Sequence, residues 1–137
     1  MCYKISLSLS ILTLFIVTSC ATQVEFPVSK VSPGADITAK FKQDKNDNYS
    51  IDLEAKNLTT PDRLDPPKEM YVVWIETARG TKNLGKLTMS SGLFSSKRTG
   101  SLSTTSAFKP QRFLITAENS STNNEPGTFV IVTSKDF

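Results

Sequence analysis

The sequence predicts an all-β fold, an immunoglobulin-like antiparallel β-sandwich of about seven strands that occupies residues 35–137. Three observations predict this class. Apolar and polar residues alternate with a period of two along several short stretches, and turn-forming residues separate these stretches. No stretch carries a convincing apolar stripe of the helical period. A chain of 137 residues is expected to form one domain.

The first two strands of this domain are predicted to form a hairpin. Residues 37–42 and 49–56 each alternate apolar and polar side chains, so each predicts a strand with one buried and one wet face. Residues 44–48 between them are polar turn formers. Residues 57–69 contain three prolines and predict a long connection, which is typical of a chain that crosses between two sheets.

The most apolar run of the folded domain, residues 70–76, predicts a central strand because it is rich in aromatic and β-branched residues. Residues 79–83 predict a turn that leads into a weaker strand over 84–89. Three further strands are predicted at 100–105, 112–118 and 128–133.

The amino-terminal segment has the three parts of an export signal. Lys4 gives a basic start, residues 5–17 carry no charge, and small residues follow. The apolar run is shorter than the roughly 20 residues that span a bilayer. Its ending, Val17-Thr18-Ser19-Cys20, resembles the lipobox of bacterial lipoproteins. This resemblance implies that residues 1–19 are a signal peptide, that cleavage occurs between Ser19 and Cys20, and that Cys20 receives acyl chains.

Residues 20–34 are predicted to form the lipidated cysteine and a tether, because they contain prolines, glycine and small polar residues. An alternative stays open here. Val24, Phe26 and Val28 alternate with polar or proline residues, so residues 24–30 also fit a first edge strand.

Composition excludes several classes of function. The chain has no histidine, which removes Ser-His and Cys-His nucleophile pairs and the common zinc sites. Both cysteines are assigned, Cys2 to the signal and Cys20 to the anchor, so the mature domain is left without a thiol. The 16 basic and 13 acidic residues form no sustained basic run for nucleic acid. We therefore expect no enzyme, cofactor, metal or nucleic-acid partner.

Residues 44–52 imitate the first nine positions of a calcium loop. Tyr49 stands in place of the required glycine and Ala55 in place of the bidentate glutamate, so a polar hairpin turn is the favoured interpretation.

Asp52 and Glu54 share one strand face, which raises the alternative of a carboxylate-only glycan hydrolase. Lys40 and Lys42 are expected as cross-strand neighbours, so a solvated, charge-paired face is favoured instead.

Aromatic residues at two places are candidate recognition surfaces. Trp74 and Tyr71 could stack on a sugar, but their place in the most apolar strand favours a core role. Phe94 lies among small polar residues and is the better candidate for an exposed contact, with Lys97 and Arg98 beside it.

Residues 70–132 also carry a family resemblance. A Tyr-x-x-Trp strand (Tyr71 to Trp74), a Leu-Gly pair at Leu84 and a Thr-x-Glu strand ending at Glu118 before Pro126-Gly127 resemble the extracytoplasmic carboxy-terminal domain of anti-sigma-K-type factors. The resemblance implies an immunoglobulin-like sandwich. It does not imply binding of a sigma factor, because those regulators use a cytosolic domain and a membrane-spanning helix that this sequence lacks.

These observations predict a non-enzymatic lipoprotein of the bacterial cell envelope that acts as a binding or scaffolding module. Ala21, rather than Asp, follows the cysteine, which favours the outer membrane with the domain facing the periplasm. The alternative is an envelope sensor or accessory subunit that works through a membrane partner, with residues 90–98 as the contact.

Overall fold

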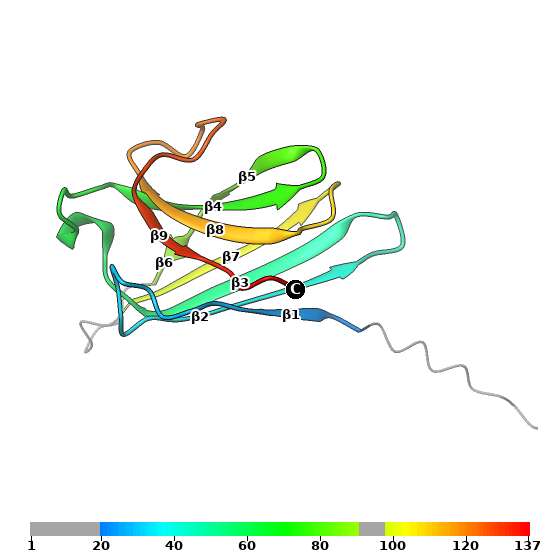
Figure 1. Ribbon diagram of the computed structural model, residues 1–137, viewed down its shortest axis with the longest axis horizontal. Helices are drawn as coiled ribbons and strands as arrows, with labels where there is room; N and C mark the ends of the chain where they lie inside the picture. The colour runs from blue at the N-terminus through cyan, green and yellow to red at the C-terminus, as the bar shows by residue number, and fades with distance from the viewer. Residues whose placement is uncertain (1–19, 91–97) are drawn as a thin grey trace, which may run out of the picture.

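The computed structural model describes residues 20–90 and 98–137, and within them the chain forms nine strands and one short 3-10 helix, Pro61–Arg63 (Figure 1). The strands are β1 (Thr22–Glu25), β2 (Asp36–Gln43), β3 (Tyr49–Leu58), β4 (Met70–Thr77), β5 (Gly80–Lys86), β6 (Thr88–Met89), β7 (Arg98–Ser106), β8 (Arg112–Glu118) and β9 (Val130–Thr133). The predicted all-β class is confirmed.

The strands form two antiparallel sheets that face each other. One sheet has the order β1-β2-β3-β7-β6 and the other β5-β4-β8-β9. Strands β2 to β9 follow the immunoglobulin arrangement, in which ABED packs on CFG and a C′ strand adds to the second sheet. The predicted immunoglobulin-like sandwich is therefore confirmed. The number of strands is nine rather than seven, because β1 is added and the predicted strand over 84–89 is divided into β5 and β6.

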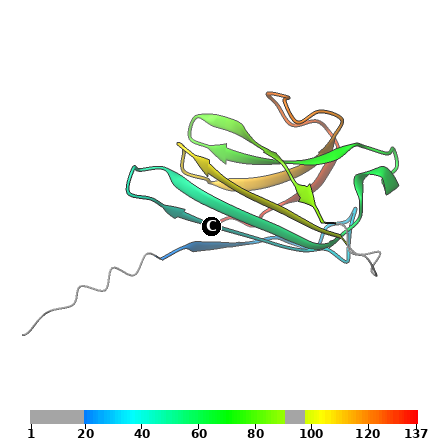
Figure 2. The same ribbon diagram turned by 180° about the vertical axis from the view of Figure 1, so that it is seen from behind.

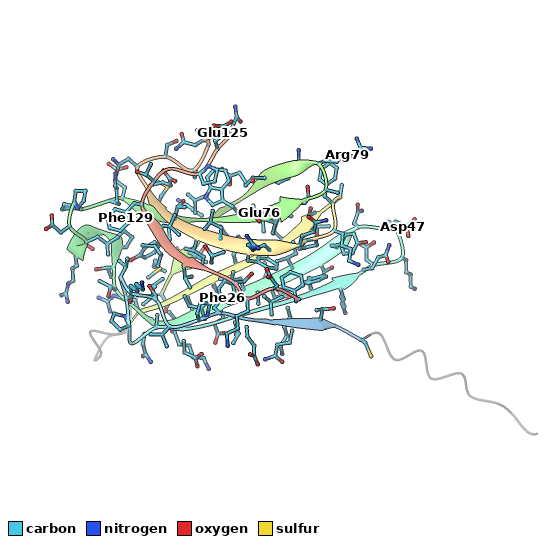
Figure 3. The ribbon with its side chains drawn as sticks, viewed as in Figure 1. Phe26, Asp47, Glu76, Arg79, Glu125 and Phe129 are labelled. Carbon is cyan, nitrogen blue, oxygen red and sulfur yellow. The ribbon has the colours of Figure 1, made fainter. Side chains whose placement is uncertain are left out.

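The space between the sheets is filled by the inward residues of the alternating strands. Tyr71, Phe113 and Ile51 are among the largest fully buried side chains. The rings of Phe26 and Phe41 both lie within 6.4 Å of the Phe113 ring, centroid to centroid, and Figure 3 shows Phe26 near the β1 edge. Burial of each large apolar side chain stabilises the fold by about 1.5–3 kcal/mol.

The hairpin of β2 and β3 and the central strand β4 agree with the predictions. Lys40 pairs with Asp52 in the β2–β3 register, and β4 lies between β5 and β8. The connection after β3 carries the chain from one sheet to the other, as predicted.

The predicted tether is corrected. β1 pairs with β2 from Thr22 opposite Phe41 to Glu25 opposite Thr38, so the sandwich begins at residue 22 rather than 35. The alternative of an edge strand is correct in kind but not in its bounds, because of residues 24–30 only Val24 and Glu25 lie in β1. Pro27, which cannot donate a ladder hydrogen bond, follows the end of the strand. Beyond it, buried Ser29 donates a 2.7 Å hydrogen bond from Oγ to the carbonyl of Ile131.

The predicted turn over 79–83 is also corrected, because only Ala78 and Arg79 separate β4 from β5. Gly80 has a φ of 96°, a left-handed conformation that glycine adopts without strain and that permits this tight turn. Thr77 Oγ1 donates to the Gly80 carbonyl at 2.8 Å.

The predicted strand 84–89 is divided between the two sheets. β5 ends at Lys86, and β6 pairs with β7 in the opposite sheet (Figure 2). Leu87 lies at the crossing, buried, with its backbone N–H donating to the Tyr71 carbonyl at 2.9 Å.

Candidate functional site

Cys20 is an exposed free cysteine that stands just before the first strand. Ala21 alone separates it from β1, and Ala21 lines a shallow hollow together with Lys42 at the end of β2. Two extended residues span about 7 Å. The Cys20 thiol is therefore held close to the sandwich rather than at the end of a long tether. Ser19, the other predicted cleavage residue, lies outside the described residues.

Residues 20–90 and 98–137 contain no helix with the length and apolar character needed to cross a membrane. Within the same residues, no group of three or more His, Cys, Asp or Glu side chains is arranged to hold a metal ion.

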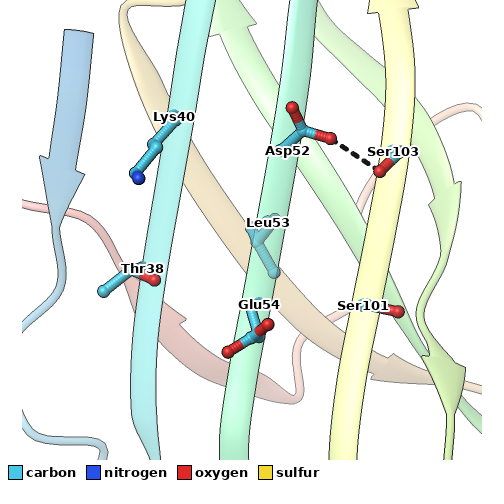
Figure 4. Close-up of a pocket in the computed structure, with 7 residues that line it drawn as sticks. All are labelled: Thr38, Lys40, Asp52, Leu53, Glu54, Ser101 and Ser103. Carbon is cyan, nitrogen blue, oxygen red and sulfur yellow. Dashed lines mark hydrogen bonds between the residues drawn. The ribbon is translucent and has the colours of Figure 1, made fainter. Parts of the chain in front are cut away.

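The outward face of the five-stranded sheet carries the two carboxylates that sequence analysis singled out. A hollow of about 320 Å³ is bordered by residues of three adjacent strands, Thr38, Lys40, Asp52, Leu53, Glu54, Ser101 and Ser103 (Figure 4). Ser103 Oγ donates a 2.6 Å hydrogen bond to Asp52 Oδ1. Asp52 and Glu54 are both exposed, so neither has the buried environment in which a carboxyl group serves as a general acid.

The expected charge pairing on this face is correct only in part. Lys40 lies opposite Asp52, but Lys42 lies opposite Ser50. Figure 4 shows the Lys40 ammonium group directed away from Asp52, and Glu54 instead has Lys56 Nζ at 3.4 Å. The face offers carboxylate, hydroxyl and amine groups on a shallow surface, which suits binding of a polar partner.

The calcium-like segment forms the turn of the β2–β3 hairpin, as predicted. Asp44 Oδ1 accepts hydrogen bonds from the backbone N–H groups of Asn46 at 2.7 Å and Asn48 at 3.0 Å. Gln43 Nε2 donates to Asp47 Oδ1 at 3.2 Å. The carboxylates of Asp44 and Asp47 therefore stabilise the turn itself, as aspartates in tight turns commonly do.

Trp74 and Tyr71 have the core role that the sequence favours, because their exposed fractions are 0% and 1%. Neither ring is open to a sugar. Tyr71 faces the space between the sheets, and its hydroxyl donates to the Thr59 carbonyl at 2.5 Å. Burial, with a smaller contribution from the negative charge of Asp62, raises the pKa of the Tyr71 phenol above its ordinary value.

Trp74 lies on the other face of β4, because Val73 and Ile75 on either side of it point into the main core. Its indole Nε1 donates a 2.8 Å hydrogen bond to Thr116 Oγ1, and Thr116 Oγ1 donates to Glu118 Oε1 at 2.7 Å. A chain of hydrogen bonds thus runs along the outside of the four-stranded sheet.

Glu118 is a buried carboxylate, 7% exposed, that sequence analysis did not identify as a site. Besides the Thr116 hydroxyl, it accepts the backbone N–H of Gly127 at 2.7 Å. Asn83 Nδ2 donates to the carbonyls of Ser121 and Asn123, each at 2.9 Å. These bonds hold the loop over residues 119–129 back against the sheet. The only sequence signal was an acidic residue at the end of an apolar strand before Pro126-Gly127.

Of the three residues predicted to form a surface contact, the structure describes only Arg98. Phe94 and Lys97 lie outside the described residues. Arg98 is the first residue of β7, half-buried and opposite Leu58 of β3.

Comparisons of the chain with protein-family models, with curated proteins and with solved structures find no match. The resemblance to the anti-sigma-K-type domain and the lipobox resemblance therefore stay predictions.

Proposed function

We propose that this chain is a lipoprotein of the bacterial cell envelope, anchored through acyl chains on Cys20 and acting as a non-enzymatic binding or scaffolding module. The observation that carries the proposal is the position of Cys20, which ends a lipobox-like sequence and stands exposed just before the first strand. Such a cysteine is accessible to an acyl-transferring enzyme, because it is exposed and lies outside the strands. Two or three acyl chains give stable membrane attachment, whereas one gives only reversible attachment.

The binding role is supported by the kind of surface that the sandwich offers. The polar face around Asp52 and Glu54 spans three strands of a rigid sheet and carries hydroxyl, carboxylate and amine groups. Sheets hold side chains at fixed spacing, so such a face would bind a partner with little movement of its backbone. Ala21 after the cysteine favours the outer membrane, with the domain in the periplasm.

The anchor is tested with two cysteine variants of the full chain in a bacterial host. Cys20→Ser removes the predicted acceptor, and Cys2→Ser is the matched control because it leaves Val17-Thr18-Ser19-Cys20 intact. We expect radiolabelled palmitate to enter the wild type and Cys2→Ser but not Cys20→Ser, and only Cys20→Ser to leave the membrane fraction. A Cys20→Ser chain that stays in the membrane fraction would contradict the proposal.

Crosslinking in intact cells separates the scaffolding role from the alternative of an accessory subunit. A single stable complex with one membrane protein would favour the accessory subunit. A distribution over several envelope components, or over envelope polymers, would favour the scaffold.

A further inference from the structure

The end of the sandwich where β1 begins gathers four segments of the chain. β1 starts opposite Phe41, close to the end of β2, so Cys20 precedes β1 at the same end of the sandwich as the β2–β3 turn of residues 44–48. β3 begins opposite the end of β7, and β4 ends opposite the start of β8. The β4–β5 turn and the β7–β8 loop are therefore at this same end (Figure 1), which we name the anchor end.

The turns of both sheets surround a hollow of about 460 Å³ at the anchor end. Its lining includes two cationic side chains, two amides, one carboxylate and an aromatic ring, which belong to Arg79, Lys109, Gln43, Gln111, Asp47 and Phe108. Figure 3 shows Asp47 and Arg79 at this end. Lys82 lies nearby, with its Nζ 4.9 Å from the centre of the Phe108 ring.

The charges around this hollow favour an anionic ligand. Within the described part of the chain, neither Arg79 nor Lys109 has a carboxylate within 4.0 Å. Asp47, the one carboxylate of the lining, accepts a hydrogen bond from the Gln43 amide. The Asp44 carboxylate of the same turn is occupied by backbone N–H groups. The two cations of the lining therefore outnumber its one carboxylate, and the Lys82 ammonium group beside Phe108 adds further positive charge.

We infer that the hollow at the anchor end binds the phosphate headgroup of an anionic phospholipid. This inference rests on the proposed function, because acyl chains on Cys20 would bring the anchor end to the level of the headgroups. Arg79 and Lys109 supply the charge for the phosphodiester, and the amide of Gln111 supplies further donors. Lipid at this site would fix the orientation of the sandwich on the membrane, which the acyl chains alone leave free to tilt.

The test uses the chain from Cys20 onward, which contains both sheets and the whole described core. Its thiol is coupled to a maleimide lipid in vesicles of phosphatidylcholine with or without phosphatidylglycerol. Coupling raises the effective concentration of headgroups, so weak binding becomes measurable. Hydrogen exchange then reports the protection of backbone amides in residues 78–80 and 107–111, and in residues 59–69 at the opposite end.

The double variant Arg79→Gln, Lys109→Gln is compared with Arg63→Gln, Lys68→Gln, which removes the same charge from exposed or half-buried positions at the opposite end. We expect phosphatidylglycerol to slow exchange at the anchor end of the wild type and of the Arg63/Lys68 control. Loss of both Arg79 and Lys109 is expected to weaken docking about 25-fold, at about fivefold per cation near an anionic surface. High salt should weaken the docking of all three proteins.

The inference is overturned if phosphatidylglycerol changes exchange equally at both ends, if it changes exchange at neither end, or if both double variants lose protection to the same extent. Because coupling is chemical, these outcomes do not depend on acylation in the cell. The fractionation of Cys20→Ser tests the acyl anchor, and the exchange experiment tests the headgroup site. Either result can therefore be negative while the other is positive.

Discussion

The indole Nε1 of Trp74 and Oγ1 of Thr116 lie 2.8 Å apart on the outer face of the four-stranded sheet, away from the space between the sheets. In antibody domains the tryptophan of the corresponding strand points into the inter-sheet core. Here Val73 and Ile75 occupy that core and Trp74 faces outward, yet it is completely buried. The domain therefore has a second, smaller buried region, which the bonds of Glu118 and Asn83 to the 119–129 loop hold closed.

Thr116→Val is expected to lower the free energy of unfolding by about 2–4 kcal/mol, because a buried indole N–H loses its acceptor and a buried carboxylate loses a donor. Urea denaturation followed by tryptophan fluorescence measures this change. Thr105→Val is the matched control, since Thr105 is exposed on β7, and its effect should stay within about 0.5 kcal/mol. Equal midpoints for the two variants would contradict the role of Thr116.

Gly127→Ala should destabilise the domain by about 1–3 kcal/mol. A Cβ at this position would stand 2.9 Å from both carboxylate oxygens of Glu118, which is held by Thr116 and cannot easily withdraw. Gly34→Ala serves as the control, because a Cβ added at residue 34 would meet no atom within 4 Å. Thermal unfolding of the two variants gives the comparison, and a Gly34→Ala chain as unstable as Gly127→Ala would argue against the clash.

Tyr71→Phe removes the hydrogen bond to the Thr59 carbonyl and should cost about 1–2 kcal/mol at neutral pH. The variant should also change the alkaline response. The pKa of Tyr71 is raised above 10.0 in the folded state, so its stabilising effect is complete below pH 10.0 and is lost as pH rises through the folded-state pKa. The difference between wild-type and variant stability is therefore expected to shrink above pH 10.0. Stability curves that stay parallel at alkaline pH would show that Tyr71 does not titrate this way.

The double variant Asp52→Asn, Glu54→Gln tests the remaining catalytic alternative. Both side chains are exposed, so the free energy of unfolding should change by less than about 1 kcal/mol. We expect neither the wild type nor the variant to release reducing ends from cell-wall glycans. Release by the wild type that the variant lacks would replace the binding role with a hydrolytic one.

Much of the sandwich is predictable because the apolar residues of the alternating sequence are also the residues that are buried in the structure. β2 and β3 alternate cleanly, and the Asp44 turn between them makes its own hydrogen bonds. The predicted strand over 112–118 coincides with β8, and the apolar run of residues 70–76 lies within the central strand β4.

The strands and the buried carboxylate that sequence analysis placed wrongly or missed depend on contacts between distant residues, which the alternation of apolar and polar residues does not reveal. Of the alternating residues Val24, Phe26 and Val28 only Val24 lies in β1, which gains its stability from pairing with β2. β5 is obscured in the sequence by Lys82 and Asn83, polar residues whose strand conformation is set by β4. The role of Glu118 depends on a loop that returns from residue 127, and no local pattern signals such a return.

The edge strands of the two sheets affect whether copies of this chain associate with one another at high density. Strands left unpaired at an edge can pair with a neighbouring molecule, and short or lysine-bearing edges discourage this. One sheet ends in the four residues of β1 and the two residues of β6, while β5 at an edge of the other carries Lys82 and Lys86. Molecules confined to a plane collide often, and such edges would keep them from assembling into fibres.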